Sequence, residues 1–132
     1  MPKAAILCVD DETVVLESLE IELRKNFGDT YLYEFAENAD EALEIIEELV
    51  AENIHILAIV SDWLMPGMKG DELLITIHNK YPKIITIMLT GQADIESIER
   101  AKTYANLHTF LYKPWNSSDL IEAINSGLEK LQ

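Results

Sequence analysis

The chain has 132 residues and a net charge of −14, with 48% hydrophobic and 26% charged residues. This composition is that of a single folded globular domain, and it excludes a disordered or low-complexity chain. No apolar run approaches the roughly 20 residues of a membrane span, and the strong acidity disfavours direct binding to nucleic acid or anionic lipid. The N-terminus lacks the pattern of a secretory signal, so one cytoplasmic domain over residues 1–132 is expected. The only cysteine, Cys8, lies in an apolar run and is predicted to be a core residue.

Apolar runs with β-branched residues alternate with helical patterns along the chain. Leu16, Leu19 and Leu23 repeat at helical spacing, and Gly28 ends that pattern. Asn38, followed three residues later by Glu41, has the spacing of a capping box. The predicted strands are 4–9, 31–35, 56–61, 84–89 and 109–112; the predicted helices are 12–26, one capped at Asn38, 70–80, 95–105 and one capped by Asn116 or Ser117.

Five strands that alternate with five helices predict an α/β fold with an open, doubly wound parallel sheet. Right-handed crossovers place the helices on both faces of such a sheet. The functional crevice then lies at the carboxyl ends of the strands. Polar residues at those ends are therefore the candidates for function.

Four strand ends carry polar residues that suit one site. Asp10 and Asp11 follow the first strand, Asp62 the third, Thr90 the fourth and Lys113 the fifth. Three carboxylates in one place repel each other unless cations neutralise them. Lys113 and a hard divalent ion such as Mg²⁺ would do so, because all-oxygen ligands favour this ion. An ionised Asp62 could then attack phosphorus, with the metal and the lysine neutralising the phosphoryl group.

Each residue also has an ordinary structural role when it is taken alone. Asp10 or Asp11 could cap the first helix, Thr90 could be a turn residue, and Lys113 could be a surface lysine. Their joint placement at four strand ends favours the functional interpretation.

Four segments carry the candidate residues and their neighbours: Cys8-Val9-Asp10-Asp11-Glu12, Ser61-Asp62-Trp63-Leu64-Met65-Pro66-Gly67-Met68-Lys69-Gly70, Leu89-Thr90-Gly91 and Tyr112-Lys113-Pro114-Trp115. In order and spacing, and over essentially the whole chain, they resemble the signature segments of response-regulator receiver domains. The resemblance implies a flavodoxin-like sheet with strand order 2-1-3-4-5 and five flanking helices. It also implies a phosphoacceptor domain of two-component signal transduction, which takes a phosphoryl group from the phosphohistidine of a sensor histidine kinase.

Position by position, the resemblance assigns the acceptor and the metal site. Asp62 matches the phosphoacceptor. Asp11 matches the direct Mg²⁺ ligand, and Asp10 matches the acid that acts through water. Leu64 matches the position whose backbone carbonyl completes the metal site, together with Asp62.

The resemblance also assigns switch and tuning positions. Thr90 matches the hydroxyl that follows the phosphoryl group, and Phe110 matches an aromatic residue that swings inward as Thr90 moves. Lys113 matches the lysine that pairs with the phosphate. Leu64 and Gln92 match tuning positions that influence how fast the aspartyl phosphate is hydrolysed. Gly91 matches a tuning position where a small residue lets the phosphate reach the site.

For its partners, the resemblance implies a sensor kinase as donor and an output domain, tethered or separate, that is not contained in these residues. Phosphorylation would change the face made by the fourth helix, fifth strand and fifth helix, and this face could also form a homodimer. The domain would catalyse only its own phosphorylation and dephosphorylation, so it is not expected to be an enzyme in the wider sense.

Three alternatives remain open at this point. An Mg²⁺-dependent phosphatase would use an aspartate nucleophile on the first strand, but it would need a second Asp where Glu12 stands. An FMN-binding module would suit the fold, but a phosphate cradle needs Gly, Ser or Thr donors after the first strand. A degenerate receiver would act only as an interaction module, although the acceptor-site residues are all present.

Overall fold

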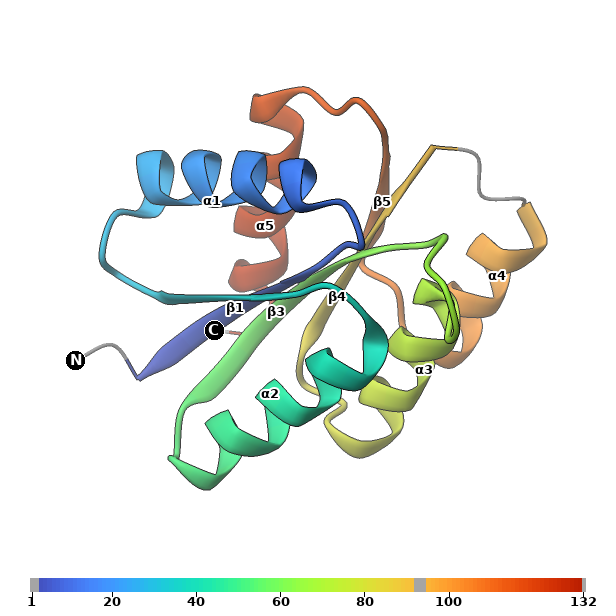
Figure 1. Ribbon diagram of the computed structural model, residues 1–132, viewed down its shortest axis with the longest axis horizontal. Helices are drawn as coiled ribbons and strands as arrows, with labels where there is room; N and C mark the ends of the chain where they lie inside the picture. Colours follow the sequence, from blue (N-terminus) through green and yellow to red (C-terminus); the bar gives the residue numbers. More distant parts are fainter. Residues whose placement is uncertain (1–2, 92–94, 132) are drawn as a thin grey trace.

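The computed structural model describes residues 3–91 and 95–131, and in them five strands alternate with five helices (Figure 1). The strands form one parallel sheet in the order β2-β1-β3-β4-β5, which confirms the predicted fold class and order. The elements are β1 Ala4–Val9, α1 Thr13–Phe27, β2 Leu32–Ala36, α2 Ala39–Ala51, β3 His55–Asp62, α3 Gly70–Lys80, β4 Ile85–Thr90, α4 Ile95–Tyr104, β5 Thr109–Tyr112 and α5 Ser117–Glu129.

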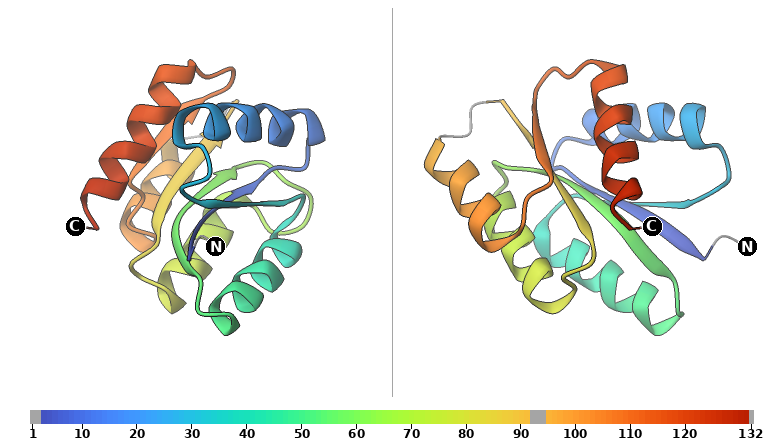
Figure 2. Two further views of the ribbon diagram at one scale, coloured as in Figure 1. Left: turned by 90° about the vertical axis from the view of Figure 1, so that its left-hand side faces the viewer. Right: turned by 180° about the vertical axis from the view of Figure 1, so that it is seen from behind.

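Helices cover both faces of the sheet: α1 and α5 lie on one face, and α2, α3 and α4 lie on the other (Figures 1 and 2). The central strands are apolar at successive positions because both sets of their side chains are buried. Ile6 and Val60 pack in the core under α1 and α5, whereas Leu7 and Ile59 pack under the other three helices. Each such buried aliphatic side chain contributes about 1.5–3 kcal/mol.

Two of the predicted helix caps are present. The Asn38 side chain accepts a hydrogen bond from the Glu41 backbone N–H at 2.8 Å, as expected for the start of α2. Asn116 accepts from the Ser118 N–H at 2.9 Å, so it is Asn116, rather than Ser117, that caps α5. These caps fix where the chain leaves β2 and β5.

Three strands end one residue later than predicted: β2 at Ala36, β3 at Asp62 and β4 at Thr90. The last two matter for the site. Asp62 still pairs with Leu89, and the Trp63 N–H donates to the Leu89 carbonyl at 2.9 Å. Thr90 pairs with Tyr112. Both polar residues therefore lie on the last rungs of the ladder, where backbone hydrogen bonds fix them more firmly than a loop would.

The composition-based expectations on the core and on membrane spans agree with the structure. Cys8 is fully buried in β1, and burial raises the pKa of its thiol, so it is a core residue. Among the described residues, no helix combines the length and apolarity needed to cross a bilayer.

Candidate functional site

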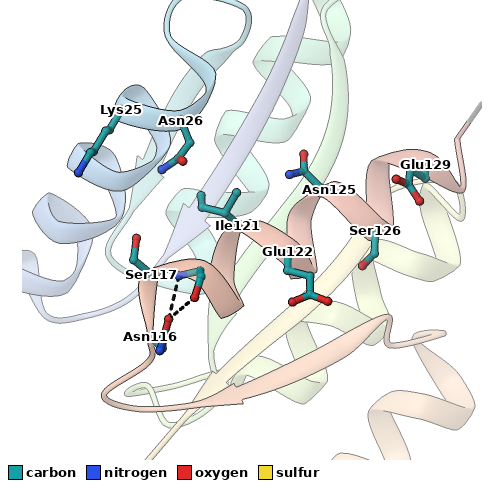
Figure 3. A pocket seen from close by; sticks show the side chains of 10 residues that line it. Lys25, Asn26, Asn116, Ser117, Ile121, Glu122, Asn125, Ser126 and Glu129 are labelled. Atoms are coloured by element: carbon teal, nitrogen blue, oxygen red, sulfur yellow. Dashed lines mark hydrogen bonds between the residues drawn. The ribbon is translucent and has the colours of Figure 1, made fainter.

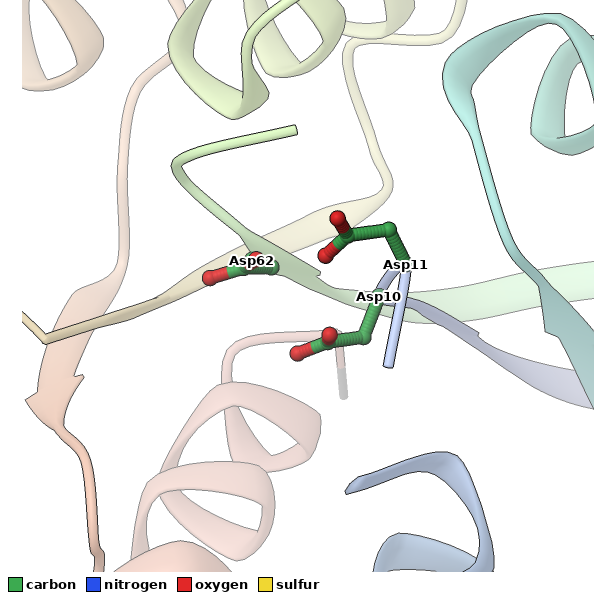
Figure 4. A group of neighbouring side chains, drawn as sticks. All are labelled: Asp10, Asp11 and Asp62. Atoms are coloured by element: carbon green, nitrogen blue, oxygen red, sulfur yellow. The ribbon is translucent and has the colours of Figure 1, made fainter. Parts of the chain in front are cut away.

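Three carboxylates meet at the carboxyl edge of the sheet (Figure 4). Asp10 and Asp11 follow β1, and Asp62 ends β3, the neighbouring strand. Each offers an oxygen, and these oxygens all lie within 4.8 Å of one another. Asp10 and Asp62 are buried while Asp11 is exposed, so the cluster is open to solvent on the Asp11 side.

Lys113 places one cation among these acids. Its Nζ atom lies 2.7 Å from Asp10 Oδ2 and 3.1 Å from Asp62 Oδ1. Its backbone N–H donates to the Thr90 carbonyl at 2.8 Å, which fixes the end of β5 against β4. Lys113 thus contacts predicted residues at three other strand ends: Asp10 and Asp62 through its ammonium group, and Thr90 through its backbone N–H.

The buried Asp10 carboxylate is hydrogen-bonded on both sides. Asp10 uses both oxygens: Oδ1 accepts from the Glu12 backbone N–H at 2.9 Å, and Oδ2 accepts from Lys113. Asp10 therefore does not cap α1: its bond goes to the N–H of Glu12, which is itself the N-cap residue, and no side chain caps this helix. Glu12, which the sequence patterns left without a role, also lies 4.0 Å from the Lys113 ammonium.

The electrostatics of the cluster raise the proton affinity of the predicted acceptor. Burial, followed by repulsion from Asp10, raises the pKa of Asp62 to about 6, and the hydrogen bond and charge of Lys113 counteract part of the rise. Burial by itself lowers the pKa of Lys113, but its hydrogen bonds to Asp10 and Asp62 outweigh this, so that pKa is raised. Lys113 therefore stays charged, whereas Asp62 needs further positive charge to be fully ionised.

The raised pKa of Asp62 predicts a pH-dependent stability. The carboxyl has an ordinary pKa of 3.8 and one of about 6 in the folded protein, so folding favours its protonated form. The resulting stabilisation is complete below the lower value and is lost as the pH rises through the upper one. In EDTA, Asp62→Asn is expected to unfold at higher urea than the wild type at about pH 7.5, with a smaller difference at about pH 5. A difference that grows towards pH 5 would contradict this account.

Three of the other predicted positions lie at the same edge of the sheet. Thr90 is fully buried, and Gly91 next to it is exposed; a Cβ at Gly91 would meet no atom within 4 Å. That Gly91 gives a phosphoryl group access to the site stays a prediction. Leu64 is two residues after Asp62, and its side chain is half exposed. Gln92, the remaining tuning position, lies outside the described residues.

Phe110 lies half-buried in β5 and connects this strand to α4. Its ring packs edge-on against Tyr112, with the ring centroids 5.4 Å apart, and the Lys102 Nζ lies 5.9 Å from its centroid. A change in the Phe110 rotamer would therefore alter its contacts with Lys102 on α4 and with Tyr112 on β5. That it moves together with Thr90 stays a prediction.

One close contact at the site was not predicted from the sequence. A Cβ at Gly70, the first residue of α3, would overlap the backbone carbonyl oxygen of Asp62. The Gly70 N–H donates to the Trp63 carbonyl at 2.7 Å, which closes the loop that follows Asp62. The Gly70 in the motif was the available signal, but only the structure shows what it touches.

A separate hollow lies between the end of α1 and α5 (Figure 3). Polar side chains such as Asn26, Asn116 and Asn125 line it, together with Lys25 and Glu129. None of the predicted site residues lines this hollow, so it is not part of the carboxylate site.

Comparison with known proteins agrees with this geometry. The family model of the response regulator receiver domain matches residues 6–125. The chain belongs to this family. Its acidic pocket of Asp10, Asp11 and Asp62 fits a phosphoacceptor site, and the chain is a receiver domain of two-component signal transduction.

Solved receiver domains share this fold over nearly their whole length. The signal receiver domain of an HD domain-containing protein from Pseudomonas fluorescens Pf-5 is 31% identical, with a TM-score of 0.85; the match covers 96% of this chain and 95% of that one. A CheY-like receiver domain protein from Methanospirillum hungatei JF-1 is 33% identical, with a TM-score of 0.83 and coverage of 96% and 94%.

The similar curated proteins are much longer than this chain. The hydrogenase transcriptional regulatory protein HoxA of Cupriavidus necator is 28% identical over 127 residues, which are 96% of this receiver but only 24% of HoxA. The chain thus spans about a quarter of that relative's length.

Proposed function

We propose that this receiver domain accepts a phosphoryl group on Asp62, in a Mg²⁺-dependent transfer from the phosphohistidine of a sensor histidine kinase. The observation that carries the proposal is the Lys113 ammonium, which contacts the Asp10 and Asp62 carboxylates at the open edge of the sheet. A site of this kind needs little covalent machinery, because phosphoryl transfer depends on position and charge.

The donor set fits Mg²⁺. Three carboxylates within reach of one ion supply hard oxygen ligands, and an exposed Asp11 leaves room for the water molecules that this ion retains. Asp11 and Asp62 would bind directly, Asp10 through water, and Leu64 through its backbone carbonyl. When bound, the ion supplies positive charge that keeps Asp62 ionised and neutralises phosphoryl oxygens.

Asp62, Lys113 and Thr90 have different roles in the transfer. A carboxylate oxygen of Asp62 forms a bond to phosphorus as the bond from phosphorus to the histidine nitrogen breaks, and the imidazole keeps that electron pair. Lys113 offsets the negative charge of the incoming group, and the Thr90 hydroxyl donates a hydrogen bond to one of its oxygens. Because Asp62 lies on the last rung of β3, the sheet fixes its backbone at the carboxyl edge where the site lies.

Asp10 is the less suitable nucleophile. Both of its oxygens are already engaged, one by the Glu12 N–H and one by Lys113, and its side chain is fully buried. An aspartate-nucleophile phosphatase reaction at the end of β1 is therefore disfavoured.

Residues 1–132 form one receiver domain under this proposal, and its output is carried by a tethered or separate partner. The domain turns over no substrate besides its own aspartyl phosphate. It works in the cytoplasm, where the sensor kinase obtains its phosphoryl group from ATP. The output face is α4–β5–α5, on which Tyr104 and Tyr112 are more than half exposed. It suits a protein partner or a second copy, and the charge of −14 disfavours DNA.

The direct test is phosphorylation by a small donor. Wild-type protein with acetyl phosphate and Mg²⁺ is expected to gain the mass of one phosphoryl group, and Asp62→Asn is expected to gain none. An unmodified wild-type protein would instead support a receiver that acts only as an interaction module.

Magnesium affinity tests the metal site independently. Asp11→Asn removes a charged ligand and is expected to weaken Mg²⁺ binding by about tenfold or more, as measured by titration calorimetry. Glu17→Gln on α1 makes the same charge change at an exposed position outside the cluster, and it should leave the affinity within about twofold. Equal losses in both variants would show that net charge, and not coordination by Asp11, governs binding.

A further inference from the structure

Hydrogen bonds hold the chain both at Lys113 and two residues beyond it. Upstream, its backbone N–H is bonded to the Thr90 carbonyl. Downstream come Pro114, which has no N–H, and Trp115, before Asn116 caps α5. The position of the loop after Lys113 therefore depends on what Trp115 contacts.

Trp115 is bonded to α1. Its indole Nε1–H donates to Glu22 Oε2 at 2.7 Å, across 93 positions of sequence, and its ring packs against the core under α1 and α5. A hydrogen bond to a carboxylate is both shorter and stronger than one between neutral groups. Glu22, Trp115 and Lys113 also line the same hollow between α1 and the β5–α5 loop.

We propose that the Glu22–Trp115 hydrogen bond is a positioning element for Lys113 during phosphoryl transfer. It fixes the loop two residues beyond the lysine, and this keeps the ammonium between Asp10 and Asp62. Glu22 and Trp115 are positioning residues, since neither touches the reacting atoms. The inference rests on the proposed transfer to Asp62.

The Lys113 ammonium must be placed accurately, because it contacts two carboxylates. The Glu22–Trp115 hydrogen bond matters for this reason, although it lies away from the reacting atoms. Lys113 Nζ holds two carboxylates at once, at 2.7 and 3.1 Å. A lysine side chain has many rotamers, so its backbone must be fixed for one of them to serve both partners. Displacement of a charged group by about 1 Å can slow a positioned reaction by up to about 100-fold.

The test measures the rate constant of phosphorylation by acetyl phosphate at saturating Mg²⁺, by intact mass, in folded protein. Glu22→Ala removes the acceptor and is expected to lower the rate about tenfold. Glu22→Gln keeps an oxygen acceptor and should stay within about twofold of the wild type. Glu17→Ala, an exposed acid on the same helix, should not change the rate.

Two further variants separate positioning from general destabilisation. Trp115→Phe keeps a ring in the core but removes the donor, so it should match Glu22→Ala. The double variant should be no slower than either single variant, because both remove one interaction. The Trp115 indole N–H resonance, assigned by its loss in Trp115→Phe, should shift in Glu22→Ala and be retained in Glu22→Gln.

The outcomes are distinguishable. Wild-type protein that is phosphorylated on Asp62, with Glu22→Ala and Trp115→Phe at the wild-type rate, would overturn this inference and leave the proposed function standing. Equal slowing by Glu22→Gln and Glu22→Ala would also overturn it. Wild-type protein that takes no phosphoryl group would overturn both.

Discussion

Lys113→Ala is expected to slow phosphorylation of Asp62 by acetyl phosphate at least about 100-fold, because it removes the only cation that contacts the buried carboxylates in the described part of the site. The loss acts in two ways. The incoming phosphoryl group meets uncompensated negative charge, and the pKa of Asp62, which Lys113 holds down, rises further above about 6. Rates would be measured by intact mass at saturating Mg²⁺.

The control for this prediction is Lys83→Ala, which removes the same charge from an exposed position at the start of β4, the opposite edge of the sheet. It should leave the rate within about twofold, since solvent screens distant surface charges. If both lysine variants slow the reaction equally, the effect comes from net charge and not from Lys113.

Gly70→Ala is expected to destabilise the fold by about 2–3 kcal/mol, as overpacking at a backbone contact does. The added methyl group would overlap the Asp62 carbonyl oxygen and lie against the Trp63 backbone, neither of which can rotate away as a side-chain tip could. The loop between Asp62 and α3 would have to shift, so phosphorylation should slow as well. Urea unfolding measures the first effect and intact mass the second.

Gly91→Ala is the matched control for stability, because a Cβ there would meet nothing within 4 Å. Its free energy of unfolding should stay within about 0.5 kcal/mol of the wild type, as for an ordinary surface change. A Gly70→Ala variant as stable as Gly91→Ala would mean that the α3 start is free to move away from Asp62.

The fold and most of the site could be predicted from the sequence because both depend on local patterns. Strands that are apolar at every position indicate coverage on both faces, and parallel strands bring their carboxyl ends to one edge. Asp10, Asp62, Thr90 and Lys113 each lie at the end of a strand or directly after it, so their meeting needed no knowledge of long-range packing. The strand ends themselves were one residue off, because the ladder continues through Asp62 and Thr90.

The rest depends on contacts that no local pattern encodes. The bond between Trp115 and Glu22 joins residues 93 positions apart and follows from how α1 packs beside α5. The contact of Gly70 with the Asp62 carbonyl arises from the path of the loop between them. The raised pKa of Asp62 combines burial with three neighbouring charges, so it needed atomic distances.

The most direct test of the central claim is to locate the phosphoryl group. After phosphorylation with Mg²⁺, reduction of the acyl phosphate by borohydride converts the modified aspartate to homoserine, which peptide mass spectrometry then assigns. The account predicts homoserine at position 62 alone, in the peptide that contains Ser61 and Trp63. Homoserine at position 10 or 11, with Asp62 unchanged, would contradict it.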